Sequence, residues 1–121
     1  MRFTSKAASA LLLAVSPALS YAQNSVSPED EKAIKQAIIH ELTDPDSAKF
    51  REIRISADGN TACGYVNAKN KFGGYTGFKI FQGAIIRTPN YPTRFAPISI
   101  SNSEIEEQAN LIVCHKNGVL R

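Results

Sequence analysis

Two cysteines are the residues with the clearest chemistry in this sequence. Cys63 and Cys114 lie 51 positions apart, and they can either form a disulfide or leave a thiolate free to act as a nucleophile. An even number of cysteines in an oxidising compartment favours the disulfide. A bridge that closes a loop of this size stabilises a fold by about 4 kcal/mol in the chain-entropy model. We therefore expect a disulfide and not a catalytic thiol.

Histidines and carboxylates give weaker signals. His40 and His115 are each expected near a helix C-terminus, where the helix dipole stabilises a charged imidazole. The acidic residues cluster only where helices are expected to begin, and the same dipole explains them. Metal-ligand spacing and nucleophile motifs are both missing from the sequence. We therefore expect no metal, no cofactor and no enzymatic activity, with an enzyme acting on an envelope substrate as the alternative.

The most distinctive stretch is the Gly-rich segment, residues 67–77. Backbone amides at Gly73-Gly74 could form a nest for an anion, with lysines adding charge and two rings stacking on a sugar or an aromatic group. A connection between strands whose glycines serve the turn is the favoured alternative to anion binding, because two glycines beside lysine are a weak signal. The candidate binding residues here are Asn67, Lys69, Asn70, Lys71, Phe72, Gly73, Gly74 and Tyr75.

A second candidate surface is the Pro-rich segment, residues 87–97, which contains three prolines. Prolines stiffen a loop and lower the entropy lost on binding, and tyrosine and arginine are frequent in interface hot spots. A connector that crosses the sheet with its rings in the core is the alternative, and it is favoured because proline is common in connectors. The candidate binding residues here are Arg87, Tyr91, Arg94 and Phe95.

The first 22 residues have the layout of a secretory signal peptide. Arg2 and Lys6 precede a short apolar run, and Ser20-Tyr21-Ala22 supplies small residues for cleavage. The run is far shorter than the roughly 20 residues of a membrane-spanning helix. Cleavage after Ala22 leaves 99 residues (23–121) as a single domain. It removes two of the 14 basic residues and none of the 11 acidic ones, so the net charge falls from +3 to about +1.

The expected export and the low net charge of the mature domain limit the partners that we expect. A nearly neutral domain lacks the dense basic face that nucleic-acid binding needs, so we expect no nucleic-acid partner. We expect a periplasmic or secreted protein that has no transmembrane segment after cleavage and is a monomer.

Hydrophobic periodicity predicts a helix at each end of this domain. The first begins at Pro28, capped by Ser27, and ends near Thr43, because Asp44 precedes a proline. The second begins near Ser101 or Ser103 and ends at Asn117-Gly118. Its expected apolar stripe is Ile105, Ala109, Ile112 and Val113.

Four strands are expected between the two helices. They cover residues 50–55, 61–68, 75–81 and 84–88, with a turn at Gln82-Gly83 and a short extended edge at Ile98 and Ile100. This order predicts an α+β fold, a small antiparallel sheet of about four strands flanked by an N-terminal and a C-terminal helix. Both helices are expected on one face of the sheet, with one disulfide joining the second helix to the second strand.

Residues 44–51 (DPDSAKFR), 63–70 (CGYVNAKN) and 72–78 (FGGYTGF) together resemble a family of small exported proteobacterial proteins. Its signature is DPxSAxF followed by CGxVNxKNxFGGYxGF and a late cysteine. The resemblance implies export, a small sheet flanked by helices and a disulfide, and it transfers no activity.

These observations favour an exported, non-enzymatic binding protein that contacts a protein or a cell-envelope component. The Gly-rich and Pro-rich segments would supply the contact surface. An inhibitor or immunity-type protein is one version of this interpretation, and an accessory role in envelope assembly is a further alternative.

Overall fold

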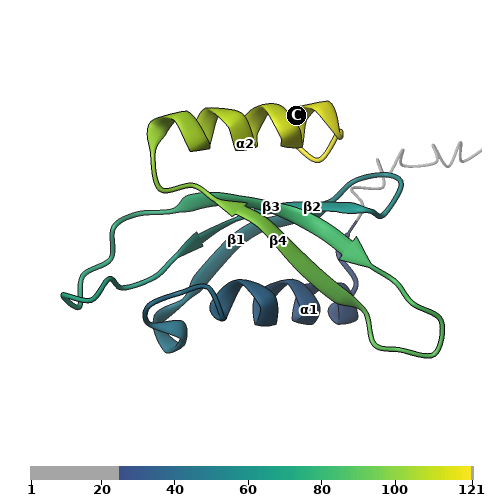
Figure 1. Cartoon of the computed structure of the whole chain (residues 1–121), viewed down its shortest axis with the longest axis horizontal. Coiled ribbons are helices and arrows are strands. Elements are labelled where there is room, and N and C mark those ends of the chain that lie inside the picture. Colours follow the sequence, from purple (N-terminus) through teal and green to yellow (C-terminus); the bar gives the residue numbers. More distant parts are fainter. Residues whose placement is uncertain (1–24, 121) are drawn as a thin grey trace, which may run out of the picture.

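The computed structural model describes residues 25–120 and shows a four-stranded antiparallel sheet between two helices (Figure 1). The strands lie in the order β1-β2-β3-β4, so each pairs with its sequence neighbour. This confirms the predicted α+β class, while the predicted signal peptide lies outside the described residues. The elements are α1 (Pro28–Ile39), a 3-10 turn (Pro45–Ser47), β1 (Lys49–Ile55), β2 (Thr61–Asn67), β3 (Lys79–Ile86), β4 (Arg94–Ile100) and α2 (Glu104–Lys116).

The two helices cover opposite faces of the sheet (Figure 1), so the prediction of both helices on one face is wrong. On one side, called the α1 face, Ile34 and Ile38 pack with Val66 of β2. On the other side, called the α2 face, Cys114 packs with Cys63 of β2. Side chains alternate between faces along a strand, and the central strands β2 and β3 carry apolar residues on both faces. Both faces must therefore be covered to remove these residues from water.

The third and fourth strands also differ from the prediction. Gln82-Gly83 is not a turn, because β3 runs through it to Ile86, and β4 occupies residues that were expected to form a connector. Gly83 is needed for close packing, since a Cβ there would collide with the backbone of Ala96 and the ring of Phe95. A small residue inside a strand was thus mistaken for a turn residue.

Helix α1 ends earlier than expected, at Ile39 and not near Thr43. The amides of Glu41 and Leu42 donate to carbonyls three residues earlier, which tightens the chain into a turn before Asp44. The predicted caps are confirmed: Ser27 accepts from the Asp30 amide and Ser103 from the Glu106 amide.

Helix α2 presents a different side to the sheet than its sequence suggested. Its buried residues are Asn110 and Cys114, whereas Ile105 and Ile112 are 82% and 65% exposed. Each residue turns a helix by about 100°, so Ile105 and Ile112 lie roughly opposite Cys114. The disulfide fixes Cys114 against β2, and the predicted apolar stripe therefore faces solvent.

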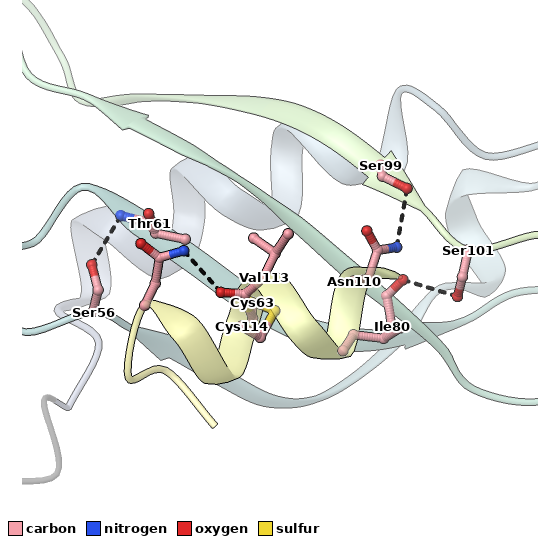
Figure 2. Close-up of a disulfide and its surroundings, with 10 residues drawn as sticks. Ser56, Thr61, Cys63, Ile80, Ser99, Ser101, Asn110, Val113 and Cys114 are labelled. Atoms are coloured by element: carbon pink, nitrogen blue, oxygen red, sulfur yellow. Dashed lines mark hydrogen bonds between the residues drawn. A yellow bond between two sulfur atoms is a disulfide. The ribbon is translucent and has the colours of Figure 1, made fainter. Parts of the chain in front are cut away.

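The predicted disulfide is confirmed and lies at the centre of the α2 face (Figure 2). Cys63 and Cys114 are both fully buried. Beside the bridge, the Asn110 side-chain amide donates to the Ser99 hydroxyl at 3.0 Å. The Ser101 hydroxyl donates to the Ile80 carbonyl at 3.1 Å. The helix is thus held on the sheet by a covalent bond, by the Asn110–Ser99 hydrogen bond and by the apolar contact of Leu111 beside the bridge.

Candidate functional site

The two candidate segments lie at opposite ends of the sheet. The Gly-rich segment connects β2 to β3 at the left of Figure 1, and the Pro-rich segment joins β3 to β4 at the right. They therefore do not form one shared contact surface, which corrects the expectation that both supply it.

The Gly-rich segment uses its own acceptors to satisfy its backbone amides. The Asn70 side-chain oxygen accepts from the amides of Phe72 and Gly74 at 2.9 and 3.2 Å. The Asn67 side-chain oxygen accepts from the Gly77 amide at 3.2 Å. Amides that are already bonded offer little to an anion, so the geometry favours a turn over an anion-binding nest. Of the glycine pair, only Gly73 adopts a positive φ, of 81°.

Two long-range hydrogen bonds attach this segment to the turn before β1. The Tyr75 hydroxyl donates to the Ser47 carbonyl, and the Lys69 amide donates to the Ser47 hydroxyl, each at 2.8 Å. The Ser47 hydroxyl donates in turn to the Asp44 carbonyl. A segment rich in glycine is thereby held in one arrangement against β1.

That attachment assembles a group of stacked cations and rings that we name the cation–aromatic cluster. The Lys49 ammonium lies 4.6 Å from the centre of the Tyr75 ring. The Arg51 guanidinium lies 4.1 Å from that of Phe78. Such contacts contribute roughly 0.5–1 kcal/mol each at exposed sites. The cluster comprises Lys49, Arg51, Tyr65, Lys69, Tyr75 and Phe78.

The cations of the cluster have no carboxylate partner among residues 25–120. The ion pairs in that part of the chain are Lys35–Glu31 and Arg87–Asp30, and both lie elsewhere. A guanidinium that stacks on a ring keeps its N–H edge free to donate to a carboxylate or a phosphate. The cluster is thus equipped to bind an anionic group at its outer side.

Phe72 lies at the tip of the same segment and is 84% exposed. The Lys71 ammonium lies 5.2 Å from the centre of its ring. The tip therefore combines an apolar ring with a flanking charge, three residues from Tyr75 of the cluster.

The Pro-rich segment is fixed to the start of α1 by an ion pair. Arg87 donates to both carboxylate oxygens of Asp30, at 2.8 and 2.9 Å. These hydrogen bonds lower the pKa of Asp30, although its burial acts in the opposite direction, and they raise the pKa of Arg87. The role of Arg87 in this arrangement is structural.

The other candidate residues of the Pro-rich segment divide between surface and core. Tyr91 is 67% exposed and Arg94 is exposed, whereas Phe95 is only 6% exposed and packs edge-on against Phe81. Phe95 is therefore a core residue, and its assignment as a contact residue is wrong. It belongs to β4, where the exposed Arg94 and the buried Phe95 point to opposite faces because neighbouring side chains of a strand do so.

The sequence pattern alone did not indicate four residues of the cluster: Lys49, Arg51, Tyr65 and Phe78. The signal that could have found them is the period of two in β1, which places Lys49 and Arg51 on one face. The register of β1 on β2 determines the contacts of these two side chains, because Arg51 pairs directly with Tyr65 of β2.

The two histidines are separated by the sheet. His40 caps α1 on one face, and His115 lies near the end of α2 on the other; both are exposed. They do not converge on a carboxylate in one cleft. Within residues 25–120, no three His, Cys, Asp or Glu side chains come together in a way that could hold a metal ion.

No helix within residues 25–120 combines the length and the hydrophobicity needed to cross a membrane. A comparison of the chain with known protein families, curated proteins and solved structures finds no match. The resemblance carried by residues 44–78 therefore stays a prediction.

Proposed function

We propose that this is an exported, non-enzymatic binding protein that attaches to anionic lipid headgroups of the cell envelope through the Gly-rich segment and β1. The observation that carries the proposal is the cation–aromatic cluster. Its three cations, Lys49, Arg51 and Lys69, stack on rings and face no carboxylate among the described residues.

Charge along the chain supports an anionic ligand for this region. Residues 49–79 contain six basic and two acidic residues, whereas the whole chain contains 14 and 11. Basic residues close to an anionic membrane surface contribute about 1 kcal/mol each to binding, within a distance set by ionic screening. Several cations around one segment can therefore bind an anionic membrane surface without a deep pocket.

The exposed ring at the tip favours a lipid surface over an acidic protein segment. Phenylalanine is among the apolar side chains that enter the boundary between headgroups and acyl chains, with lysine or arginine on the polar side. Phe72 could enter that interface while Lys71 stays among the headgroups. An acidic peptide would pair with the cations equally well, but it would leave this ring in water.

Strand addition at a sheet edge is a poor alternative mode of binding. Edge strand β4 contains Pro97, which has no amide to donate. Edge strand β1 contains a register shift between Arg51 and Arg54, where Glu52 adopts a φ of 53°. Both features hinder pairing with another strand, so side chains carry the proposed contact.

Export rests on two features of the chain. Residues 1–22 have the order of a signal peptide, and a buried disulfide is typical of an oxidising compartment such as the periplasm or the cell exterior.

Co-sedimentation with lipid vesicles tests the proposal. The purified, oxidised protein is mixed with vesicles of a zwitterionic phospholipid, or of the same lipid with about one third anionic phospholipid. We expect sedimentation with the anionic vesicles that weakens as salt increases. Equal sedimentation with both kinds of vesicle, or none with either, would contradict the proposal. If the protein binds a soluble acidic polypeptide but neither kind of vesicle, its ligand is an acidic protein and not a lipid.

A further inference from the structure

A groove of about 360 Å³ opens beside the Gly-rich segment and shares Lys69 with the cation–aromatic cluster. Its walls are residues 41–43 after α1, the end of β2 and the edge strand β4. Val66 lines it and belongs to the core on the α1 face. Its volume lies within the range of small-molecule sites, roughly 300–1,000 Å³.

One side of the groove is apolar because of an irregularity in β4. Gln82 pairs with Ser99 and Gly83 pairs with Pro97, so Ile98 between them has no partner on β3. Such a bulge re-aims a side chain and is frequent next to functional sites. Ile98 lines the groove and is 67% exposed, beside Leu42 and Ile100. A large apolar side chain is thus left in water where a ligand could cover it.

The lining of the groove also includes cationic side chains. Lys69 and Lys79 both line the groove, and Glu41 is the one carboxylate that lines it. The Lys79 ammonium donates to the Asn102 side-chain oxygen at 3.2 Å, which orients the ammonium without neutralising it. A neutral apolar ligand would leave these charges unused, and an inorganic anion would leave Ile98 in water.

We infer that this groove binds an amphipathic anion, a short aliphatic chain that ends in a carboxylate or a phosphate. The chain lies against Leu42, Ile98 and Ile100, and the anionic group lies between Lys69 and Lys79. A free fatty acid and a lipid chain that ends in a phosphate share this chemistry.

This inference does not rest on the proposed attachment to a membrane surface. The groove lies on the α1 face, where Val66 pairs with Lys79, whereas Arg51 and Tyr65 of the cluster lie on the α2 face with Cys63. Lys69 is the residue that the two sites share. Variants at Lys79 and Ile98 therefore test the groove alone.

Calorimetric titration of the purified protein with octanoate and with octyl phosphate, below their micelle-forming concentrations, tests this site. Saturable binding of at least one is expected, about tenfold or more tighter than of octyl glucoside or of inorganic phosphate. If octanoate binds and octyl phosphate does not, the natural ligand is a carboxylate; the reverse indicates a phosphate. Absence of binding by both, or binding of inorganic phosphate with equal affinity, would overturn the inference.

Matched variants then locate the bound molecule. Ile98→Ser and Lys79→Gln should each weaken binding by about fivefold or more, because one removes apolar contact and the other removes charge. Ile112→Ser and Lys116→Gln make the same chemical changes at exposed positions on α2 and should leave affinity unchanged. Equal losses of affinity in the groove variants and in the α2 variants would place the bound molecule outside the groove. Thermal melts show whether each variant remains folded.

Discussion

The hydroxyl of Tyr75 donates a hydrogen bond of 2.8 Å to the backbone carbonyl of Ser47, 28 residues earlier in the chain. This contact holds a glycine-rich segment against the turn before β1. The ammonium groups of Lys49 and Lys69 then lie 4.6 and 5.8 Å from the centre of the Tyr75 ring. Together with the hydrogen bond from the Lys69 amide to the Ser47 hydroxyl, the Tyr75 bond positions the surface to which we assign ligand binding.

Removal of this hydroxyl should loosen the segment and leave the fold intact. We expect Tyr75→Phe to lower the free energy of unfolding by about 0.5–1 kcal/mol, since the bond is solvent-exposed. Amide hydrogen exchange across residues 69–75 should accelerate more than exchange in β3. Tyr91→Phe is the matched control, because the Tyr91 hydroxyl has no hydrogen-bond partner among residues 25–120. Identical exchange in the two variants would show that the Tyr75 bond does not hold the segment.

The elements of the fold follow largely from local sequence signals. Ser27-Pro28 and Ser103 start the helices, and Asn117-Gly118 ends the second one with a φ of 68° at Gly118. These signals are local because each cap satisfies amides or carbonyls within one turn of the helix. The disulfide was also predictable, from the number of cysteines and the signal-like leader.

The arrangement of the helices depends on non-local facts and was not predictable in the same way. Ile105 and Ile112 have helical spacing, yet the bridge from Cys114 to Cys63 decides which side of α2 meets the sheet. Likewise, glycine is typical of turns, and only the close contact of Gly83 with the ring of Phe95 explains a glycine inside this strand. The cluster was missed for a similar reason, since the contact of Arg51 with Tyr65 requires the register of β1 on β2.

The orientation of α2 can be tested with two neighbouring residues. Leu111 packs against the cluster of buried residues around the disulfide, whereas Ile112 is 65% exposed. We expect Leu111→Ser to destabilise the protein by roughly 1–3 kcal/mol through lost apolar burial. Ile112→Ser should stay within about 0.5 kcal/mol of the parent. Chemical denaturation measures both, and a larger loss for Ile112→Ser would mean that the helix packs through its other side.

The disulfide should account for a large part of the stability. Replacement of both Cys63 and Cys114 by Ala should cost about 4 kcal/mol, because the unfolded chain regains the entropy of a 51-residue separation. In a domain of this size, each kcal/mol shifts the melting temperature by about 4–8 °C. Thermal unfolding with and without reductant checks this expectation. A melting temperature that neither reduction nor substitution changes would contradict it.

The Asp30–Arg87 pair should give the fold a defined sensitivity to acid. The hydrogen bonds from Arg87 lower the pKa of Asp30 in the folded state. The pair therefore stabilises the fold fully at pH values above the pKa of an aspartate in the unfolded chain, about 4. This contribution is lost as the pH falls through the lower pKa of the folded state. Asp30→Asn should therefore be less stable than the parent at pH 7, and the difference should shrink as the pH is lowered below about 4.

A second carboxyl group with a lowered pKa, that of Asp58, also makes stability depend on pH and must be separated from Asp30. The pKa of Asp58 is also lowered, first by the Ser56 hydroxyl and then by the Asn60 amide. Asp58 is unchanged in the Asp30→Asn variant, so the difference between the two stability profiles isolates Asp30. Parallel profiles from pH 7 down to pH 2.5 would show that the Arg87 pair does not link folding to protonation.

The most direct test of the central claim is the partition of one double variant onto anionic vesicles. Lys49→Gln/Arg51→Gln removes two cations of the cation–aromatic cluster and should lower the partition coefficient by about 30-fold at low salt, since each contributes about 1 kcal/mol. Lys32→Gln/Lys116→Gln removes the same charge from the helices and should lower it less than about threefold. Equal losses in the two variants, or no loss in the first, would contradict attachment through the cluster.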